Sequence, residues 1–312
     1  MQPCRRIVSL LPSATEIVCE LGLGDRLVGV THECDHPPLV QALPRVTRTR
    51  IPAESSGREI DGLVRERLDH AAGFDALYVL DIEEVARLEP DLVITQTLCH
   101  VCAVAESQVA AATARLPMRP TVVTLEPSRL EDVFESFSTV AVAAGEPERA
   151  APVVARLRNR VEAVSRSFAR VEDLPRVVML EWIDPPFSSG HWTPEIVRLA
   201  GGVECLGRAG EPSRTLAWEE VREADPDVLV VACCGFDEDR ARSEMPSLEC
   251  LPGYRDLACV RTGRVHLMDG NAFFSRPGPR LVEGLEILAH LLHPSGSTPS
   301  VGPVHRSLPA DS

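Results

Sequence analysis

Two short clusters of histidine, cysteine and carboxylate side chains carry the most obvious chemical potential in this sequence. The first reads HECDHP at residues 32–37, and the second reads LCHVC at residues 98–102. Imidazole nitrogen and thiolate sulfur are ligands that soft and borderline metal ions prefer. The candidate metal ligands are therefore His32, Cys34, His36, Cys99 and Cys102.

Other interpretations of these clusters remain open. One C-x-x-C pair without a second pair is a weak zinc signal. The same residues could be loop polar groups that hydrogen-bond locally beside unreacted thiols. They could supply an axial ligand to a metal inside a cofactor. They could also form a redox dithiol, because a helix start lowers the pKa of a nearby thiol.

Aromatic side chains form a second feature, because the chain has few of them and concentrates them. Only 4% of residues are aromatic, yet residues 182–192 (WIDPPFSSGHW) hold two of the three Trp and one Phe. Phe273 and Phe274 are adjacent in a later Pro- and Gly-rich stretch. Such rings suit the binding of a large flat ligand, and they equally suit a core. Trp182 and Phe273 fit either role, whereas Trp192 beside a helix start favours ligand contact.

Motifs of common enzyme classes are absent from the sequence. It contains no P-loop, no G-x-G-x-x-G, no G-x-S-x-G and no H-E-x-x-H. The acidic pairs Glu83-Glu84 and Glu219-Glu220 recur within helical patterns and indicate solvated helix faces. We therefore expect a binding protein that needs no resident cofactor. A thiol- or metal-dependent enzyme using Cys34, Cys99 and Cys102 is the alternative.

One long amphipathic helix is predicted near the middle of the chain, at residues 148–171. Its apolar positions recur every three or four residues, at Ala150, Val153, Val154, Leu157, Val161, Val164 and Phe168. A helix of this length would span about 36 Å, the width of a small domain. It can connect two lobes, or it can be a surface helix of one large domain.

An internal repeat on either side of this helix favours two lobes. Residues 80–96 (LDIEEVARLEPDLVITQ) match residues 216–232 (LAWEEVREADPDVLVVA) without a gap, at a displacement of 136 positions. Each copy predicts a helix ended by Pro-Asp and followed by a buried parallel strand. Strands at residues 27–31 and 177–181 lead into HECDHP and into the aromatic loop, and ligands of open α/β sheets bind at such strand ends. Ser13 with Glu16 has capping-box spacing, and Thr193 precedes Pro194 as a second expected helix cap.

Composition limits the partners of the protein. The net charge of −14 opposes binding to nucleic acid and to anionic membranes. No run of about 18 apolar residues is present, so no membrane-spanning segment is predicted.

The cysteines and the first residues bear on the cellular compartment. A chain of 312 residues does not need disulfide bonds to be stable, so its ten cysteines favour a reducing compartment. The first residues leave no room for a secretion signal. These patterns predict a cytoplasmic protein, unless an upstream leader is missing from the sequence.

The chain resembles the cobalamin-binding, substrate-binding proteins of ABC importers over about residues 5–293. The motifs that carry the resemblance are SLLPSATEIVCELGLGDRLVGVTHECDHP, EEVARLEPDLVITQ, EWIDPPFSSGHWTPEIVRLAGG and DGNAFFSRPGPRLVEGLEIL. The resemblance implies an α/β fold: two Rossmann-like lobes with central parallel sheets, one long connecting helix, and a ligand cleft between the lobes. It places the N-terminal lobe at residues 1–127, the last lobe helix and connecting helix at 128–171, and the C-terminal lobe at 172–293. A disordered tail is expected at 294–312.

The resemblance also implies a function and a set of site residues. Members of this class bind cobalamin, haem, iron siderophores or metal ions. The motifs here look like the branch that binds cobalamin, either for uptake or for handling inside the cell. Family members are usually periplasmic or membrane-tethered, and an exported form would have an ABC permease as partner. By position, the implied ligand-binding residues are Ser13, Cys34, Asp35, Cys99, Trp182, Phe187, Trp192, Phe236, Asn271, Phe273 and Arg276.

Overall fold

The computed structural model describes residues 3–69, 77–96, 106–114, 116 and 119–294. The chain divides into two compact units. Unit 1 comprises Met1–Ser55, Glu59–Pro127 and Glu131–Arg156, and unit 2 comprises Ser56–Arg58, Ser128–Leu130 and Leu157–Ser312. The predicted tail beyond residue 294 and the cluster at residues 98–102 lie outside the described residues.

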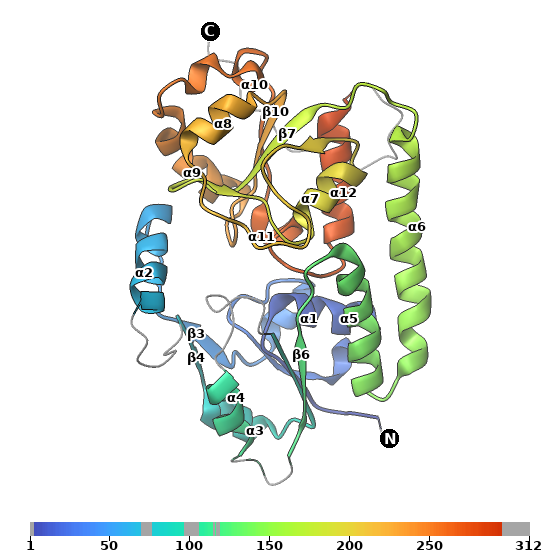
Figure 1. The fold of residues 1–312 in the computed structure, drawn as a ribbon. Helices are drawn as coiled ribbons and strands as arrows, with labels where there is room; N and C mark the ends of the chain where they lie inside the picture. Colours follow the sequence, from blue (N-terminus) through green and yellow to red (C-terminus); the bar gives the residue numbers. More distant parts are fainter. Residues whose placement is uncertain (1–2, 70–76, 97–105, 115, 117–118, 295–312) are drawn as a thin grey trace. The chain divides into compact units, whose positions relative to one another are not determined.

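Unit 1 is built on a parallel sheet with the strand order β2-β1-β5-β6 (Figure 1). Its strands are β1 (Ile7–Ser9), β2 (Leu27–Val30), β5 (Leu92–Gln96) and β6 (Thr121–Leu125), with a separate antiparallel pair, β3 (Thr47–Thr49) and β4 (Tyr78–Leu80). Its helices are α1 (Pro12–Glu20), α2 (Gly57–Asp69, of which the first two residues belong to unit 2), α3 (Ile82–Leu88), α4 (Glu106–Thr113) and α5 (Leu130–Ala143, of which the first residue belongs to unit 2). The central strands β1 and β5 are apolar and buried, as a doubly covered parallel sheet requires.

Unit 2 has its own sheet, with the order β11-β10-β7-β8 and with β9 also paired to β7. The strands are β7 (Arg176–Trp182), β8 (Phe187–Ser188), β9 (Val203–Glu204), β10 (Val228–Val231) and β11 (Val265–Leu267). The helices are α7 (Thr193–Leu199), α8 (Trp218–Ala224), α9 (Glu238–Glu249), α10 (Ala258–Arg261), α11 (Gly270–Phe273) and α12 (Leu281–Leu292). Figure 1 shows α7 and α12 on one side of the sheet and α8 and α9 on the other. The predicted α/β class with two Rossmann-like units is confirmed.

Equivalent residues in the two copies of the sequence repeat form equivalent hydrogen bonds in the two units. Asp91 accepts hydrogen bonds from the backbone N–H groups at the start of β1, and Asp227 accepts one from the backbone N–H of Arg176 at the start of β7. The guanidinium of Arg6 donates to the carbonyl of Leu88 at the end of α3, and that of Arg176 donates to Ala224 at the end of α8. Asp91 and Leu88 lie 136 positions before Asp227 and Ala224. The Pro-Asp motif therefore joins each helix end to the first strand of its unit.

The predicted connecting helix is α6 (Ala150–Phe168), which passes from unit 1 into unit 2 after Arg156. Its predicted apolar stripe is buried or half-buried along its whole length. In unit 1, Arg156 forms an ion pair with Glu20. In unit 2, Arg160 forms a bidentate pair with Glu286 of α12, at 2.7 and 2.8 Å. Each half of α6 is thus anchored to its own unit.

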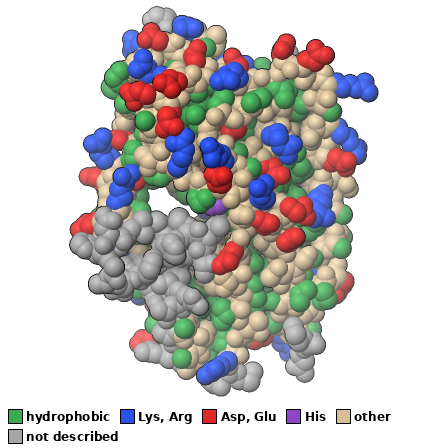
Figure 2. Space-filling view, viewed as in Figure 1, with side chains coloured by type: hydrophobic (Ala, Val, Ile, Leu, Met, Phe, Trp, Pro, Cys, Tyr) green, Lys and Arg blue, Asp and Glu red, His purple; other side chains and the backbone are tan. Residues whose placement is uncertain are grey.

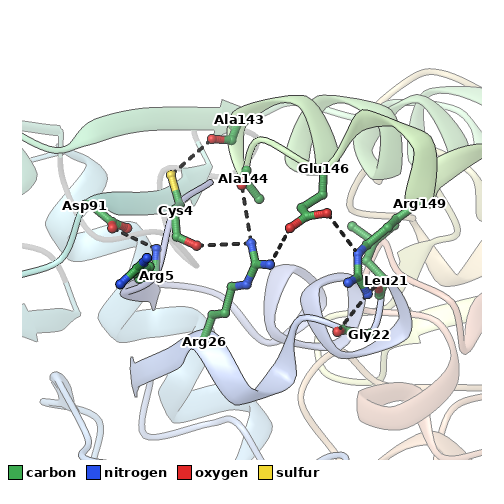
Figure 3. A network of polar contacts seen from close by, with 10 residues as sticks. All are labelled: Cys4, Arg5, Leu21, Gly22, Arg26, Asp91, Ala143, Ala144, Glu146 and Arg149. Atoms are coloured by element: carbon green, nitrogen blue, oxygen red, sulfur yellow. Dashed lines mark hydrogen bonds and ion pairs between the residues drawn. The ribbon is translucent and has the colours of Figure 1, made fainter. Parts of the chain in front are cut away.

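A polar network around Arg26 fastens the N-terminus of unit 1 to the turn before α6 (Figure 3). The Arg26 guanidinium donates to the carbonyl oxygens of Cys4 at 3.1 Å and Ala144 at 3.5 Å, and it pairs with the carboxylate of Glu146. The hydrogen bond from Arg26 is the main cause that lowers the pKa of Glu146 below its usual value. Arg149 extends the network to the carbonyls that end α1.

We expect Arg26→Ala to lower the Tm of the protein by several degrees, because it leaves two carbonyls and one carboxylate without their shared donor. Differential scanning calorimetry measures the change. The matched control is Arg87→Ala, which removes an exposed pair with Glu84 and should leave the Tm close to the parent value. Equal losses in the two variants would contradict a structural role for the network.

The two predicted helix caps are wrong, the first by two residues and the second by one. Helix α1 begins at Pro12 with Leu11 as its N-cap, so Ser13 and Glu16 lie inside the helix and are buried. Helix α7 begins at Thr193, and its N-cap is Trp192. In both cases proline lies in the first turn, where its missing N–H leaves no hydrogen bond unmade. Among the described residues, no helix has the length and apolar character needed to cross a membrane.

Candidate functional site

In unit 1, the predicted site residues Ser13 and Cys34 are buried beneath the carboxyl ends of β1 and β2. The side chain of Cys34 is only 1% exposed. Its Sγ atom lies 3.1 Å from Thr15 Oγ1 and 3.6 Å from Thr31 Oγ1. These contacts make the Cys34 thiol part of the hydrogen-bonded interior of unit 1.

The loop after β2 presents the remaining members of the first cluster. Arg45 holds this loop by donating to the carbonyls of Thr31 at 2.9 Å and Cys34 at 2.7 Å. Asp35 and His36 are exposed, and the carbonyl of Asp35 accepts a hydrogen bond from Gln41. The structure thus separates Cys34, which points inward, from its two exposed neighbours.

His32 is held in a defined orientation beside β3 and β4. Its Nδ1 atom lies 2.7 Å from Thr47 Oγ1, which also accepts a hydrogen bond from the His32 backbone N–H at 3.0 Å. The rings of His32 and Tyr78 have centroids 5.2 Å apart, and the Tyr78 hydroxyl donates to Glu33 Oε1 at 3.1 Å. Burial lowers the pKa of His32, while Glu33 acts in the opposite direction and Arg45 lowers the pKa further.

No preformed metal site is found among the described residues. Within the described ranges, no three His, Cys, Asp or Glu side chains are placed to hold a metal ion. Cys99 and Cys102 lie outside these ranges. Within the described residues, the side chains of HECDHP therefore do not converge on one point as the ligands of a metal ion would.

In unit 2, an aromatic and cationic group lies at the carboxyl ends of β7 and β10. The rings of Trp182 and Phe236 have centroids 4.9 Å apart and are tilted by 46°. The guanidinium carbon of Arg240 lies 4.6 Å from the centroid of the Phe236 ring, in a cation–π contact. The indole N–H of Trp182 is buried and has no hydrogen-bond partner among the described residues. We call Trp182, Phe236 and Arg240 the aromatic edge.

The aromatic loop folds back on β7 through β8. Phe187 is paired in register with Trp182, and both are half-buried. Trp192 is only 5% exposed, and its indole N–H donates to the carbonyl of Phe274 at 2.8 Å. Trp192 therefore joins the end of this loop to the segment after α11.

Helix α11 places Asn271 next to the aromatic edge. The backbone N–H of Asn271 donates to the carbonyl of Phe236 at 3.0 Å. The Asn271 side chain in turn accepts a hydrogen bond from the buried Arg276 at 2.9 Å. This close approach needs Gly270, because a Cβ atom there would lie 2.2 Å from the carbonyl oxygen of Cys233. All seven predicted site residues of unit 2 lie in segments that meet at one end of its sheet.

Two carboxyl groups beneath the aromatic loop have no counterpart in the sequence predictions. Glu181 accepts a hydrogen bond from the backbone N–H of Gly190 at 3.0 Å. Glu204 accepts two, from Leu206 and Gly207, at 3.1 Å each. Burial raises the pKa of Glu181 to about 7, and the charge of Glu204 raises it further, whereas the hydrogen bond from Gly190 opposes the change. Burial likewise raises the pKa of Glu204 to about 7.

We expect these carboxyls to make the protein less stable as pH rises from about 4.5 to about 7. The folded-state pKa lies above the unfolded value, so the stabilisation is complete below pH 4.5 and is lost as pH rises through 7. One carboxyl accounts for up to about 3 kcal/mol. Urea unfolding at a series of pH values measures this effect. Between pH 4.5 and pH 7, the free energy of unfolding should fall less in Glu181→Gln than in the parent protein.

The exposed Glu219→Gln is the matched control for this measurement, and its profile should follow that of the parent. If the free energy of unfolding of the parent protein rises with pH over this interval, the raised pKa values of Glu181 and Glu204 are contradicted.

On the face of the protein shown in Figure 2, positive and negative side chains are mixed and form no continuous basic patch. With a net charge of −14, this surface lacks the positive character that nucleic-acid backbones require. The aromatic edge instead offers two aromatic rings and one guanidinium group at the strand ends of unit 2.

Curated relatives and solved structures resemble this chain over nearly its whole length. The vitamin B12-binding protein of Vibrio cholerae is 23% identical over 287 residues, covering 91% of this chain and 87% of that protein. The ABC transporter substrate-binding lipoprotein YvrC of Bacillus subtilis is 24% identical over 299 residues, covering 93% and 80%.

Solved structures share the fold. The periplasmic heme-binding protein RhuT from Roseiflexus superposes with a TM-score of 0.70 at 24% identity, covering 93% of this chain and 98% of that one. The periplasmic vitamin B12-binding protein BtuF of Vibrio cholerae gives 0.66 at 21% identity, covering 93% and 97%.

These findings contradict the predicted cytoplasmic location, because the relatives are periplasmic proteins or membrane-tethered lipoproteins. The prediction was wrong because it relied on the cysteine content and on the first residues of the sequence, and neither feature determines where this fold is used.

The family described as periplasmic binding protein matches residues 7–272, which include the strands of both sheets and α6. This match agrees with the two parallel-sheet units and with α6 between them in the sequence. The chain belongs to the periplasmic binding protein family.

Proposed function

We propose that this protein binds a corrinoid and acts as the substrate-binding component of an ABC importer. The observation that carries the proposal is the aromatic edge at the strand ends of unit 2. Trp182 and Phe236 provide ring surface, and Arg240 adds a positive charge above Phe236. A corrinoid offers the matching chemistry, with an extended macrocycle edge and polar amide side chains.

The relatives support the choice of corrinoid. A vitamin B12-binding protein matches most of the chain in sequence, and the vitamin B12-binding protein BtuF also shares its fold. By the same relationship, the ligand would be handed to a membrane permease and would leave chemically unchanged. The protein would therefore carry its ligand and would not act as an enzyme.

A thermal-shift panel with cyanocobalamin, haemin and a ferric hydroxamate tests the ligand class. A ligand that binds only the folded state raises its stability by about 2.7 kcal/mol at a concentration of 100 times Kd. We expect cyanocobalamin to raise the Tm in a concentration-dependent manner. A shift with haemin or the ferric hydroxamate and none with cyanocobalamin would assign the site to that other ligand class.

A further inference from the structure

The structure distinguishes between the two donors that follow β2, Cys34 and His32. The Cys34 thiol is buried, lies within hydrogen-bonding reach of Thr15 and Thr31, and cannot approach a bulky ligand without breaking these contacts. The side chain of His32 is 23% exposed, so part of its ring faces outward from unit 1. Of these two residues, only His32 is available to a metal held inside a large ligand.

The Thr47 hydroxyl fixes the His32 ring in the way that metal-binding histidines require. Thr47 is buried, and its oxygen has two lone pairs. One lone pair accepts the backbone N–H of His32, and the other can accept a proton held on Nδ1. In this tautomer the Nε2 atom carries a free lone pair. Metal-ligating histidines almost always donate their second nitrogen to such a partner, which sets the tautomer and the ring orientation.

Among the described residues, no hydrogen-bond donor contacts the Nε2 atom of His32. The Oε1 atom of Glu33 lies 3.9 Å from Nε2, which is beyond hydrogen-bonding distance. The Tyr78 hydroxyl donates to the same Oε1 atom and holds Glu33 in place. The lowered pKa of His32 agrees with a neutral imidazole near pH 7.

We propose that Nε2 of His32 is an axial ligand to the cobalt of the bound corrinoid. This inference rests on the proposed function and names a contact within it. When the upper axial position of cobalt(III) holds water, the water leaves and the Nε2 lone pair forms the new bond. Cobalt keeps its oxidation state, and the proton stays on Nδ1 beside Thr47. A corrinoid whose upper ligand is cyanide cannot form this bond without losing cyanide, so it would bind through its other contacts alone.

The first test compares the absorption spectra of two corrinoids on the full-length protein. We expect the bands of aquocobalamin to move to longer wavelength on binding, while the spectrum of cyanocobalamin stays unchanged. His32→Ala should abolish the shift and weaken aquocobalamin binding about tenfold or more, and it should leave cyanocobalamin binding close to the parent level. His36→Ala is the matched control, because His36 is exposed in the same loop, and it should retain the shift.

The second test needs no variant. Cobinamide lacks the nucleotide base of cobalamin, so any axial nitrogen in its complex comes from the protein. In the electron paramagnetic resonance spectrum of bound cob(II)inamide, we expect each cobalt line to be split by one coordinated nitrogen nucleus. An unsplit spectrum, or an aquocobalamin shift that survives in His32→Ala, would overturn the ligation. Gel filtration distinguishes loss of the cobalt–histidine bond from failure of the proposed function. If only the bond is absent, the corrinoid still elutes with the protein. If the proposed function fails, neither corrinoid elutes with it.

Discussion

Trp192→Ala is expected to lower the free energy of unfolding by about 3–5 kcal/mol, the usual loss for removing a buried tryptophan side chain. The indole ring is only 5% exposed, and its N–H donates to the carbonyl of Phe274. The variant would leave a cavity and an unpaired carbonyl at the junction between the aromatic loop and α11. Equilibrium urea unfolding of the ligand-free protein measures the loss.

Two further variants separate the contributions to this loss. Trp192→Phe keeps most of the ring volume and removes the hydrogen bond. Its free energy of unfolding should therefore fall by less than half of the loss in Trp192→Ala. Val203→Ala is the exposed control in the same unit, and its stability should stay close to the parent value. A loss below about 1 kcal/mol in Trp192→Ala would show that the indole is not part of the core of unit 2.

Trp182→Ala is expected to raise the Kd for cyanocobalamin about 30-fold or more, which corresponds to at least about 2 kcal/mol. Unlike Trp192, Trp182 is half-buried and packs its ring against Phe236. A ligand that covers this ring would remove a large apolar area from water, which is why tryptophan is frequent among residues that dominate binding. Titration calorimetry with parent and variant gives the ratio of the two Kd values.

Trp182→Phe is the matched control for the affinity loss, because it retains a flat ring at the same position. Its Kd should change only a few-fold. Both variants must show a Tm near the parent value for the comparison to report on binding. If Trp182→Ala binds cyanocobalamin as tightly as the parent, the aromatic edge is not the ligand-binding surface.

The architecture of the two units was accessible from the sequence because it depends on local patterns that occur twice. The Pro-Asp motif recurs at a displacement of 136 positions, and in both units its aspartate binds the start of the first strand. The apolar stripe of α6 likewise follows helical spacing along one stretch of chain. The helix begins two residues later than predicted, because Pro147–Arg149 forms a separate 3-10 turn, and it ends three residues earlier, at Phe168.

The details of the candidate site were less accessible because they depend on contacts between distant residues. HECDHP places thiol, imidazole and carboxylate side by side in sequence, yet Cys34 turns inward to Thr15 while Asp35 is exposed. The role of Glu181 depends on the backbone of Gly190 and on Glu204, which no spacing rule connects. Arg240 could have been noticed, since it lies only four positions after Phe236, in the first turn of the helix that follows it.

Isothermal titration of cyanocobalamin and aquocobalamin into the full chain tests the central claim most directly. The proposed function predicts saturable heat with one corrinoid bound per chain, and a weaker titration in Trp182→Ala. Absence of both heat and a thermal shift, with protein on the order of tens of micromolar, would contradict corrinoid binding.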